Sequence, residues 1–203
     1  MLSRREFIVT TGIGGSTLLA GCTENSQSSA SDDLEPPLLG DPESSIVVDV
    51  YADYQCSHCA DFKRNSYPIL KDEYIDTGVI AYRHRDFPFL GTLSTQSANV
   101  ARGVQDSLGN DKFWEFSTQM LENQDQLSSN WWRNTISELG GDGPSIVNMA
   151  LNGAWNSIVD ADFQYGQQLG VKGTPAVAIN NQLVPRSSPT YAQDVIEYIE
   201  RIR

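Results

Sequence analysis

Two closely spaced cysteines are the residues in this chain most able to do chemistry. Cys56 and Cys59 are separated by Ser57 and His58, and the only other cysteine is Cys22. When a Cys-x-x-Cys pair begins a helix, its first sulfur meets unpaired backbone N–H groups and the positive end of the helix dipole, which favour a thiolate. We therefore predict that Cys56 is the nucleophile of thiol–disulfide exchange. Cys59, one helical turn further on, is then the resolving thiol.

His58 lies between the two cysteines and can give a hydrogen bond or a positive charge to the thiolate. Either interaction lowers the pKa of Cys56 and stabilises the reduced state, which favours an oxidising protein. This chemistry uses the two sulfurs alone, so we predict no cofactor. A metal site is the alternative, because closely spaced cysteines also bind zinc. Structural zinc usually takes four Cys or His ligands, however, and only His58 and His84 could complete the set.

The first residues resemble an export signal. The stretch SRREF (residues 3–7) leads into an apolar segment that is too short and too rich in glycine for a good membrane span. Its paired arginines resemble the twin-arginine signal, whose passengers cross the membrane already folded, and an ordinary secretory leader is the alternative. The stretch LAGC (residues 19–22) resembles a lipobox. We predict that residues 1–21 are removed and that Cys22 carries a lipid anchor.

The segment after Cys22 is poor in apolar residues and rich in Ser, Asp, Glu, Asn and Pro. Such a segment cannot offset the entropy of ordering it, so residues 22–43 are predicted to be a flexible, lipid-anchored tether. The remaining residues, 44–203, are enough for one domain with a real core but not for two large domains.

The composition is strongly acidic. The formal net charge is -12, which repels nucleic acid and anionic lipid, so no nucleic-acid partner is predicted. The lysines are few: Lys63, Lys71, Lys112 and Lys172. Carboxylate-rich, lysine-poor surfaces are common in proteins of high-salt cells, and we predict a halophilic origin, with an ordinary acidic protein as the alternative.

The elements that must hold the cysteines follow from the apolar pattern. Residues 45–52 are almost continuously apolar, as in a strand covered on both faces. The predicted order then continues with a helix from Cys56 to about Tyr74 that Pro68 kinks or splits, a strand at 79–83, a block of helices between 93 and 170, a hairpin around Asn180-Asn181, and a final helix from Tyr191 to Ile202.

A second motif supports the redox interpretation. Gly173-Thr174-Pro175 stands directly before the predicted strand at 176–179. A proline there could simply begin a strand. Together with Cys-x-x-Cys it resembles the cis-proline turn that faces the active site in thioredoxin folds, where the backbone of Thr174 would pair with an extended substrate.

Residues from about 44 to 202 resemble the DsbA-like thioredoxin family. Four stretches carry the resemblance: DYQCSHC (53–59), RDFP (85–88), FWE (113–115) and VKGTP (171–175). It implies an α/β fold, thioredoxin-like, with an inserted helical subdomain at about 91–170. It also implies catalysis by Cys56 and Cys59 and substrate contact by Thr174 and Pro175. Family members donate, accept or shuffle disulfides in exported proteins, so the resemblance leaves the direction open.

The sequence departs from the family pattern at two positions. Ser57 stands where proline is frequent, which changes local rigidity. Val50 stands where members often carry a buried acid that assists proton transfer at the resolving thiol. Asp49 and Asp53 are possible substitutes for this acid, but strand alternation turns both to the face opposite Val50. We therefore predict a capping or solvated role for them, with a proton relay as the alternative. His84 is predicted to be a solvated residue at the end of a strand.

We predict an exported thiol–disulfide oxidoreductase, acting as a dithiol oxidase at the extracytoplasmic face of the cell membrane. Its partners would be the thiols and disulfides of extracytoplasmic proteins and a membrane redox partner. A copper- or other metal-handling protein that uses the same cysteines is the alternative, although no methionine lies near them. A tethered adaptor without catalysis is a third hypothesis.

Overall fold

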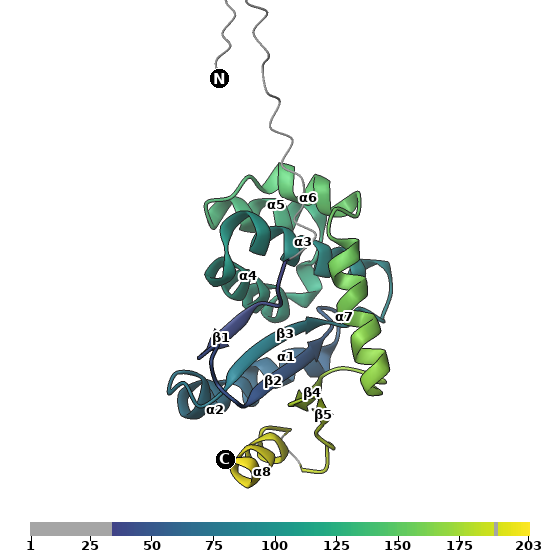
Figure 1. Ribbon diagram of the computed structural model, residues 1–203. Helices are drawn as coiled ribbons and strands as arrows, with labels where there is room; N and C mark the ends of the chain where they lie inside the picture. The colour runs from purple at the N-terminus through teal and green to yellow at the C-terminus, as the bar shows by residue number, and fades with distance from the viewer. Residues whose placement is uncertain (1–33, 189–190) are drawn as a thin grey trace, which may run out of the picture.

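A five-stranded mixed sheet forms the centre of the molecule (Figure 1). The computed structural model describes residues 34–188 and 191–203. The strands are β1 (Leu38–Gly40), β2 (Val47–Ala52), β3 (Ala81–Asp86), β4 (Ala176–Ile179) and β5 (Gln182–Leu183), and they lie in the order β1-β3-β2-β4-β5. Only β2 and β3 pair in parallel, and the other neighbours are antiparallel.

The helices follow the predicted order. After β2 come α1 (Ser57–Asn65), α2 (Tyr67–Leu70) and the π-helical turn η1 (Lys71–Ile75), and after β3 come α3 (Thr92–Leu108), α4 (Asn110–Glu122), the 3-10 turn η2 (Gln124–Gln126), α5 (Ser129–Glu138), α6 (Gly143–Leu151) and α7 (Asn156–Leu169), with α8 (Tyr191–Ile202) at the end. The predicted break at Pro68 is confirmed, because this residue lies in the first turn of α2. The hairpin is confirmed too: Asn180 and Asn181 connect β4 to β5 with φ of 47° and 65°.

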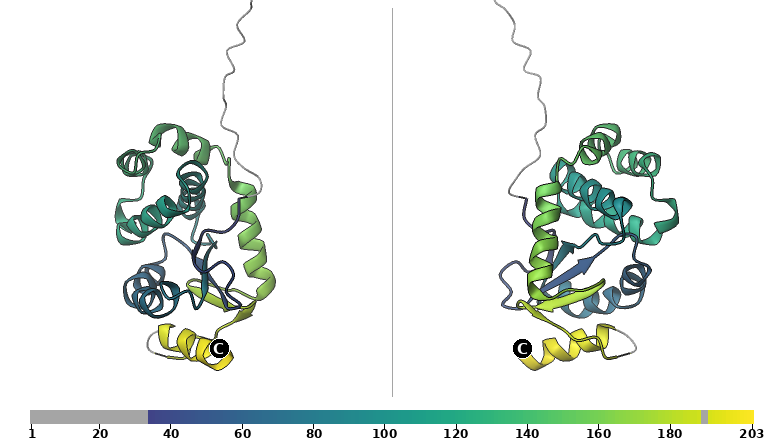
Figure 2. Two further views of the ribbon diagram at one scale, coloured as in Figure 1. Left: turned by 60° about the vertical axis from the view of Figure 1, so that its left-hand side comes forward. Right: turned by 90° about the vertical axis from the view of Figure 1, so that its right-hand side faces the viewer.

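Apolar side chains cover both faces of the sheet. On one face, Val48 and Val50 of β2 pack with α1, α2, η1 and α8 in one core cluster. On the other face, Tyr51 packs in a second cluster beside Phe163 of α7. Figure 2 shows α7 on the side of the sheet opposite α1 and α2. Burial on both faces explains why residues 47–52 carry an almost unbroken apolar run.

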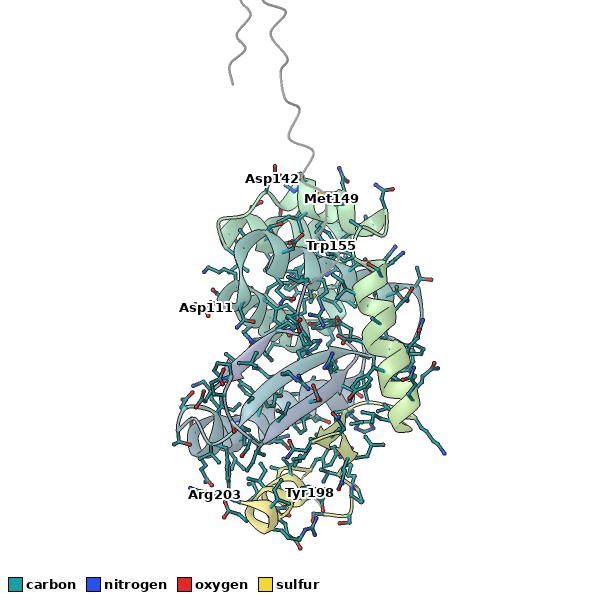
Figure 3. The ribbon with its side chains drawn as sticks, viewed as in Figure 1. Asp111, Asp142, Met149, Trp155, Tyr198 and Arg203 are labelled. Atoms are coloured by element: carbon teal, nitrogen blue, oxygen red, sulfur yellow. The ribbon has the colours of Figure 1, made fainter. Side chains whose placement is uncertain are left out.

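Helices α3 to α6 form a separate layer at one end of the sheet (Figure 1). Trp155 lies inside this layer, in the core cluster that also holds residues of α3 and α6 (Figure 3). A Cβ at position 103 would lie 2.7 Å from the Trp155 ring, so Gly103 permits the close approach of α3.

The helical insertion predicted at 91–170 is too long. The inserted layer ends with α6, whereas α7 contacts β3 and covers the sheet.

The predicted tether at residues 22–43 also needs correction. Leu38, Leu39 and Gly40 pair antiparallel with β3, and the Leu38 N–H donates to Asn110 Oδ1 at 3.0 Å. Backbone hydrogen bonds to β3 hold this short edge strand, and Leu39 also packs against the core cluster on one face of the sheet. The folded part thus begins before residue 44. Residues 22–33 of the predicted tether lie outside the described residues.

Buried ion pairs join the sheet to α3 and α7. Arg102 of α3 is fully buried and bonds the carboxylates of Asp86 and Asp162. On the α7 face, Asp49 pairs with Arg83 at 2.6 Å and with Arg85 at 2.9 Å. Taking such charges out of water is costly unless every group is paired, so the removal of one member leaves its partners exposed to that cost.

Candidate active site

Cys56 is the N-cap of α1 and follows the turn at the end of β2. Its backbone is extended, with φ of -78° and ψ of 115°, and Ser57 begins the helix. The N–H groups of Cys59 and Ala60 donate to the Cys56 carbonyl at 2.9 Å and 3.3 Å. The Cys56 side chain therefore stands at the end of the helix where backbone N–H groups are free, as the sequence predicts.

Two polar side chains fix the turn that carries Cys56. Asp53 is buried, and its carboxylate accepts the N–H groups of Gln55 at 2.8 Å and of Phe89 at 2.9 Å. Asp53 is therefore not solvated: its carboxylate binds backbone N–H groups of the turn and of the loop after β3, whereas the N-cap of α1 is Cys56 itself. Gln124 of η2 donates to the carbonyl oxygens of Tyr54 at 2.8 Å and Cys56 at 2.9 Å. The sequence gives no sign of this second brace, because Gln124 lies 68 residues from Cys56 along the chain.

The pKa values of the two thiols are shifted in opposite directions. The pKa of Cys56 is lowered to about 5, chiefly by a hydrogen bond from the Cys59 thiol and against the effect of burial. The Thr174 side chain and the backbone N–H groups of Cys59 and His58 lower it further. In contrast, burial, the hydrogen bond to Cys56 and the negative charge of Cys56 raise the pKa of Cys59 well above its ordinary value. Cys56 is therefore a thiolate at neutral pH while Cys59 stays protonated.

Thr174 and Pro175 face the cysteines, and the peptide bond between them is cis, as predicted. In its protonated form Cys56 Sγ donates to the Thr174 carbonyl oxygen at 3.3 Å. The Thr174 hydroxyl is buried without an oxygen or nitrogen partner among the described residues, and the side chain lowers the pKa of both thiols. The loop before β4 thus closes the site from the side opposite α1.

An open groove and a small cavity adjoin the cysteines. The groove has a volume of ≈430 Å³, and its lining includes His58, which lies two residues after Cys56, together with Asp61, Phe62, Pro175, Arg186 and Tyr191. His58 is exposed there. The cavity of ≈30 Å³ lies on the inner side, where Cys59, Lys63, His84, Trp114 and Ser117 are among its lining residues. The groove is large enough for side chains of a bound peptide, and the cavity is large enough for a water molecule.

Two predictions about polar residues are wrong. His84 is 4% exposed rather than solvated, with Nε2 at 3.1 Å from Asp86 Oδ1 and its ring stacked on Tyr54. Asp49 is fully buried in ion pairs with Arg83 and Arg85, so it is neither a cap nor solvated. It does lie on the face opposite Val50, as strand alternation requires. Asp49 of β2 can be buried because arginines of the neighbouring strand β3 pair with it. His84 is buried by the rings of Tyr54, Phe113 and Trp114 and contacts Asp86 of its own strand.

The described residues contain no group of three or more His, Cys, Asp or Glu side chains placed to hold a metal ion. In the same part of the chain, no helix is long and apolar enough to span a membrane. Cys22 and the export signal lie outside the described residues, so the leader and the lipid remain predictions.

Comparison with known protein families shows to which family the chain belongs. A thioredoxin family model matches residues 32–199. The chain belongs to the thioredoxin family. The match begins before residue 34, in agreement with the inclusion of β1 in the folded domain.

Individual relatives place the chain among DsbA-like members of the thioredoxin family. Disulfide bond formation protein D of Bacillus subtilis is 23% identical over 154 residues, which cover 73% of this chain and 69% of that protein. A Rickettsia typhi protein named for protein-disulfide oxidoreductase activity is 32% identical over 119 residues, or 57% of this chain. The aligned segment spans only 43% of the length of the Rickettsia protein.

Two solved structures of similar proteins share the fold of this chain. BdbD of Bacillus subtilis in its oxidised form gives a TM-score of 0.75 at 20% identity, covering 82% of this chain and 91% of that one. The thiol-disulfide exchange protein alpha-DsbA2 of Wolbachia pipientis gives 0.70 at 24% identity, covering 84% and 89%. The predicted thioredoxin-like fold with an inserted helical subdomain is confirmed, and so is the enzyme class, protein-disulfide oxidoreductase.

Proposed function

We propose that this chain is an exported dithiol oxidase that passes the Cys56–Cys59 disulfide to extracytoplasmic proteins. The observation that carries the proposal is the split in acidity between the two thiols, with the pKa of Cys56 at about 5 and that of Cys59 raised. A thiolate that is stable in the reduced protein is a good leaving group and makes the disulfide more oxidising. Relatives named for disulfide bond formation support the same direction.

The reaction takes two steps at Cys56. A substrate thiolate attacks Cys56 Sγ, the bond to Cys59 breaks, and a mixed disulfide forms. A second substrate thiolate then attacks the first substrate sulfur, and Cys56 leaves as a thiolate. The substrate has lost two electrons and the protein has gained them. Cys56 is the sulfur suited to be attacked and then to leave, because it stands at the helix terminus and its pKa is lowered.

The substrate would bind along the groove as an extended segment. The Thr174 carbonyl oxygen lies at Cys56, and Pro175 lines the groove, so the backbone before β4 can pair with a peptide that carries the attacking cysteine. His58 also lines the groove, where its imidazole can serve the thiolate of the protein or of the substrate. We assign no cofactor, because the two sulfurs complete the electron balance.

The cellular setting rests on the leader and the composition. The twin-arginine-like stretch and the lipobox-like stretch support export followed by lipid attachment at Cys22. A lipid-anchored oxidase would act at the extracytoplasmic face and would need a membrane redox partner to remove the electrons it collects. The acidic, lysine-poor composition supports a high-salt environment.

Disulfide transfer to a reduced, unfolded protein with two cysteines tests the proposal. The oxidised full chain is expected to hand over one disulfide per molecule, whereas a Cys56→Ser variant transfers none. A titration of the reduced chain with Cu(I) or Zn²⁺ tests the metal-handling alternative. Tight stoichiometric metal binding together with absent disulfide transfer would reverse the assignment.

A further inference from the structure

Disulfide exchange makes a demand on Cys59 that Cys56 does not share. When a thiolate attacks Cys56 in the oxidised protein, Cys59 leaves with the electron pair of the broken bond. Because burial raises the pKa of Cys59 well above its ordinary value, this sulfur must receive a proton. In the reverse direction, when Cys59 resolves a mixed disulfide, the same proton must leave. A proton-holding group beside Cys59 is therefore required.

The cavity beside Cys59 is built for a water molecule. Its volume of ≈30 Å³ exceeds the space that one water needs, and its lining includes the polar side chains of Lys63, His84 and Ser117. Trp114 also lines the cavity, and its Nε1 is buried without a hydrogen-bond partner in the part of the chain that the structure describes. A water in the cavity would satisfy this donor and connect Cys59 to the other polar groups.

Lys63 is the lining residue best placed to exchange the proton. It lies four residues after Cys59 on α1, and side chains at this spacing are neighbours on one helix face. Its ammonium group lies 3.4 Å from the centre of the Tyr67 ring, which keeps the side chain folded against the protein. Unlike the buried Cys59, Lys63 is partly exposed, so it can pass a proton to and from solvent.

His84 is the other candidate in the cavity and is less suitable. Its Nε2 lies 3.1 Å from Asp86 Oδ1, and Asp86 is itself bonded to Arg102. The ring is enclosed by Tyr54, Phe113 and Trp114 and is 4% exposed. A proton taken up by His84 would have no direct path to solvent.

We propose that Lys63, through a water molecule in this cavity, gives the proton to Cys59 when the disulfide opens and removes it when the disulfide closes. The inference rests on the proposed dithiol chemistry and extends it. On opening, the Cys56–Cys59 bond breaks, the Cys59 sulfur takes a proton from the water, and the water takes one from the Lys63 ammonium. The resulting amine then regains a proton from solvent. On closing, each transfer runs in reverse.

The surroundings of Lys63 suit both halves of this cycle. Burial lowers the pKa of Lys63 to about 8, and Lys71 of η1 lowers it too, while Glu122 of α4 raises it. At pH 7 Lys63 is then a neutral amine in about one-tenth of the molecules, so both its acid and its base form are available. The acid that the family resemblance leads one to expect at position 50 is a valine, and Val50 lines this same cavity. Tyr82 and His84 of β3 are the other titratable groups in the lining.

The rate of disulfide closure tests the proposal. The reduced full chain is mixed with excess oxidised glutathione, and the products are acid-quenched and measured by mass spectrometry across a range of pH. Cys56 first forms a mixed disulfide with glutathione. In the second step Cys59 displaces the glutathione and closes the Cys56–Cys59 disulfide. For the native chain, the second rate should rise with pH and level off above about 8. In Lys63→Met, it should fall at least about tenfold at pH 7 and show no levelling near 8.

Two further variants decide between explanations. Lys63→Arg keeps the charge but holds its proton at neutral pH, so it should be as slow as Lys63→Met. An Arg variant with the native rate, or a Met variant with the native rate and pH profile, would overturn the proposal. His84→Gln should keep the native second rate, and a slow second step with a normal first step in this variant would assign the proton transfer to His84 instead. Failure of the first step in the native chain would refute the proposed function rather than the role of Lys63.

Discussion

The acidity of Cys56 depends most on its neighbour Cys59, and this dependence can be measured. The hydrogen bond from the Cys59 thiol is the largest cause of the lowered pKa of Cys56. In Cys59→Ala this donor is lost. A hydrogen bond to a charged group contributes about 1.5–3 kcal/mol, and one pKa unit corresponds to about 1.4 kcal/mol. The pKa of Cys56 should therefore rise by about one to two units from its value of about 5.

Cys59→Ser is the matched control, because serine keeps an O–H donor in nearly the same place. Its Cys56 pKa should lie between those of the native chain and Cys59→Ala. The sign of the pH dependence follows from the thiolate: it dominates above the pKa, so alkylation slows as pH falls through that value. The assay is the rate of alkylation by iodoacetamide from pH 3 to 10, with the modified peptide containing Cys56 separated from Cys22 by mass spectrometry.

The reasoning is refuted if Cys59→Ala titrates at the same pH as the native chain. Such a result would leave the helix terminus and the Thr174 side chain as the main thiolate stabilisers. Equal shifts in Cys59→Ala and Cys59→Ser would instead show that the loss of sulfur, and not the loss of a donor, determines the acidity.

Four further outcomes are expected. Cys59→Ser should accumulate mixed disulfides with substrates and Cys56→Ser should form none, and equal trapping by both would contradict the assigned roles. His58→Ala removes the imidazole but keeps the backbone N–H. The pKa of Cys56 should therefore rise by at most about one unit, and the reduction potential of the Cys56–Cys59 pair should fall by about 30 mV. No change in either quantity would exclude a role for the imidazole. Arg102→Met should lower the free energy of unfolding by about 3–5 kcal/mol in urea denaturation. Arg83→Met should lower it by less, because the Arg83 side chain is 25% exposed, and similar losses would show that burial does not set the cost. Cys22→Ala should move the protein from the membrane fraction to the medium, and retention at the membrane would point to another anchor.

Local features of the sequence predict the catalytic centre well. The placement of Cys56 at a helix start, the cis bond before Pro175 and the turn at Asn180-Asn181 depend on residues that are adjacent along the chain. Their conformations follow from short-range sterics and hydrogen bonds, which a sequence carries directly. The family resemblance then supplies the overall order of elements.

Features that depend on distant partners escape this reasoning. Arg102 binds Asp162, 60 residues away, as well as Asp86, and these pairings make its burial possible. For the same reason His84 and Asp49, which look solvated in the sequence, are buried in the structure. The edge strand at 38–40 is too short to show an alternating pattern, and its backbone pairs with β3, more than 40 residues further along the chain. Lys63 gains its significance only from the cavity that α1 shares with β3 and α4.

The reduction potential of the Cys56–Cys59 pair tests the central claim most directly. The full chain would be equilibrated with mixtures of reduced and oxidised glutathione, and the fraction of disulfide measured at each ratio. A stabilised Cys56 thiolate predicts a potential above about −200 mV, in the range of oxidising members of the thioredoxin superfamily. A potential near about −270 mV, which is typical of thioredoxin as a reductant, would contradict the assignment as a dithiol oxidase.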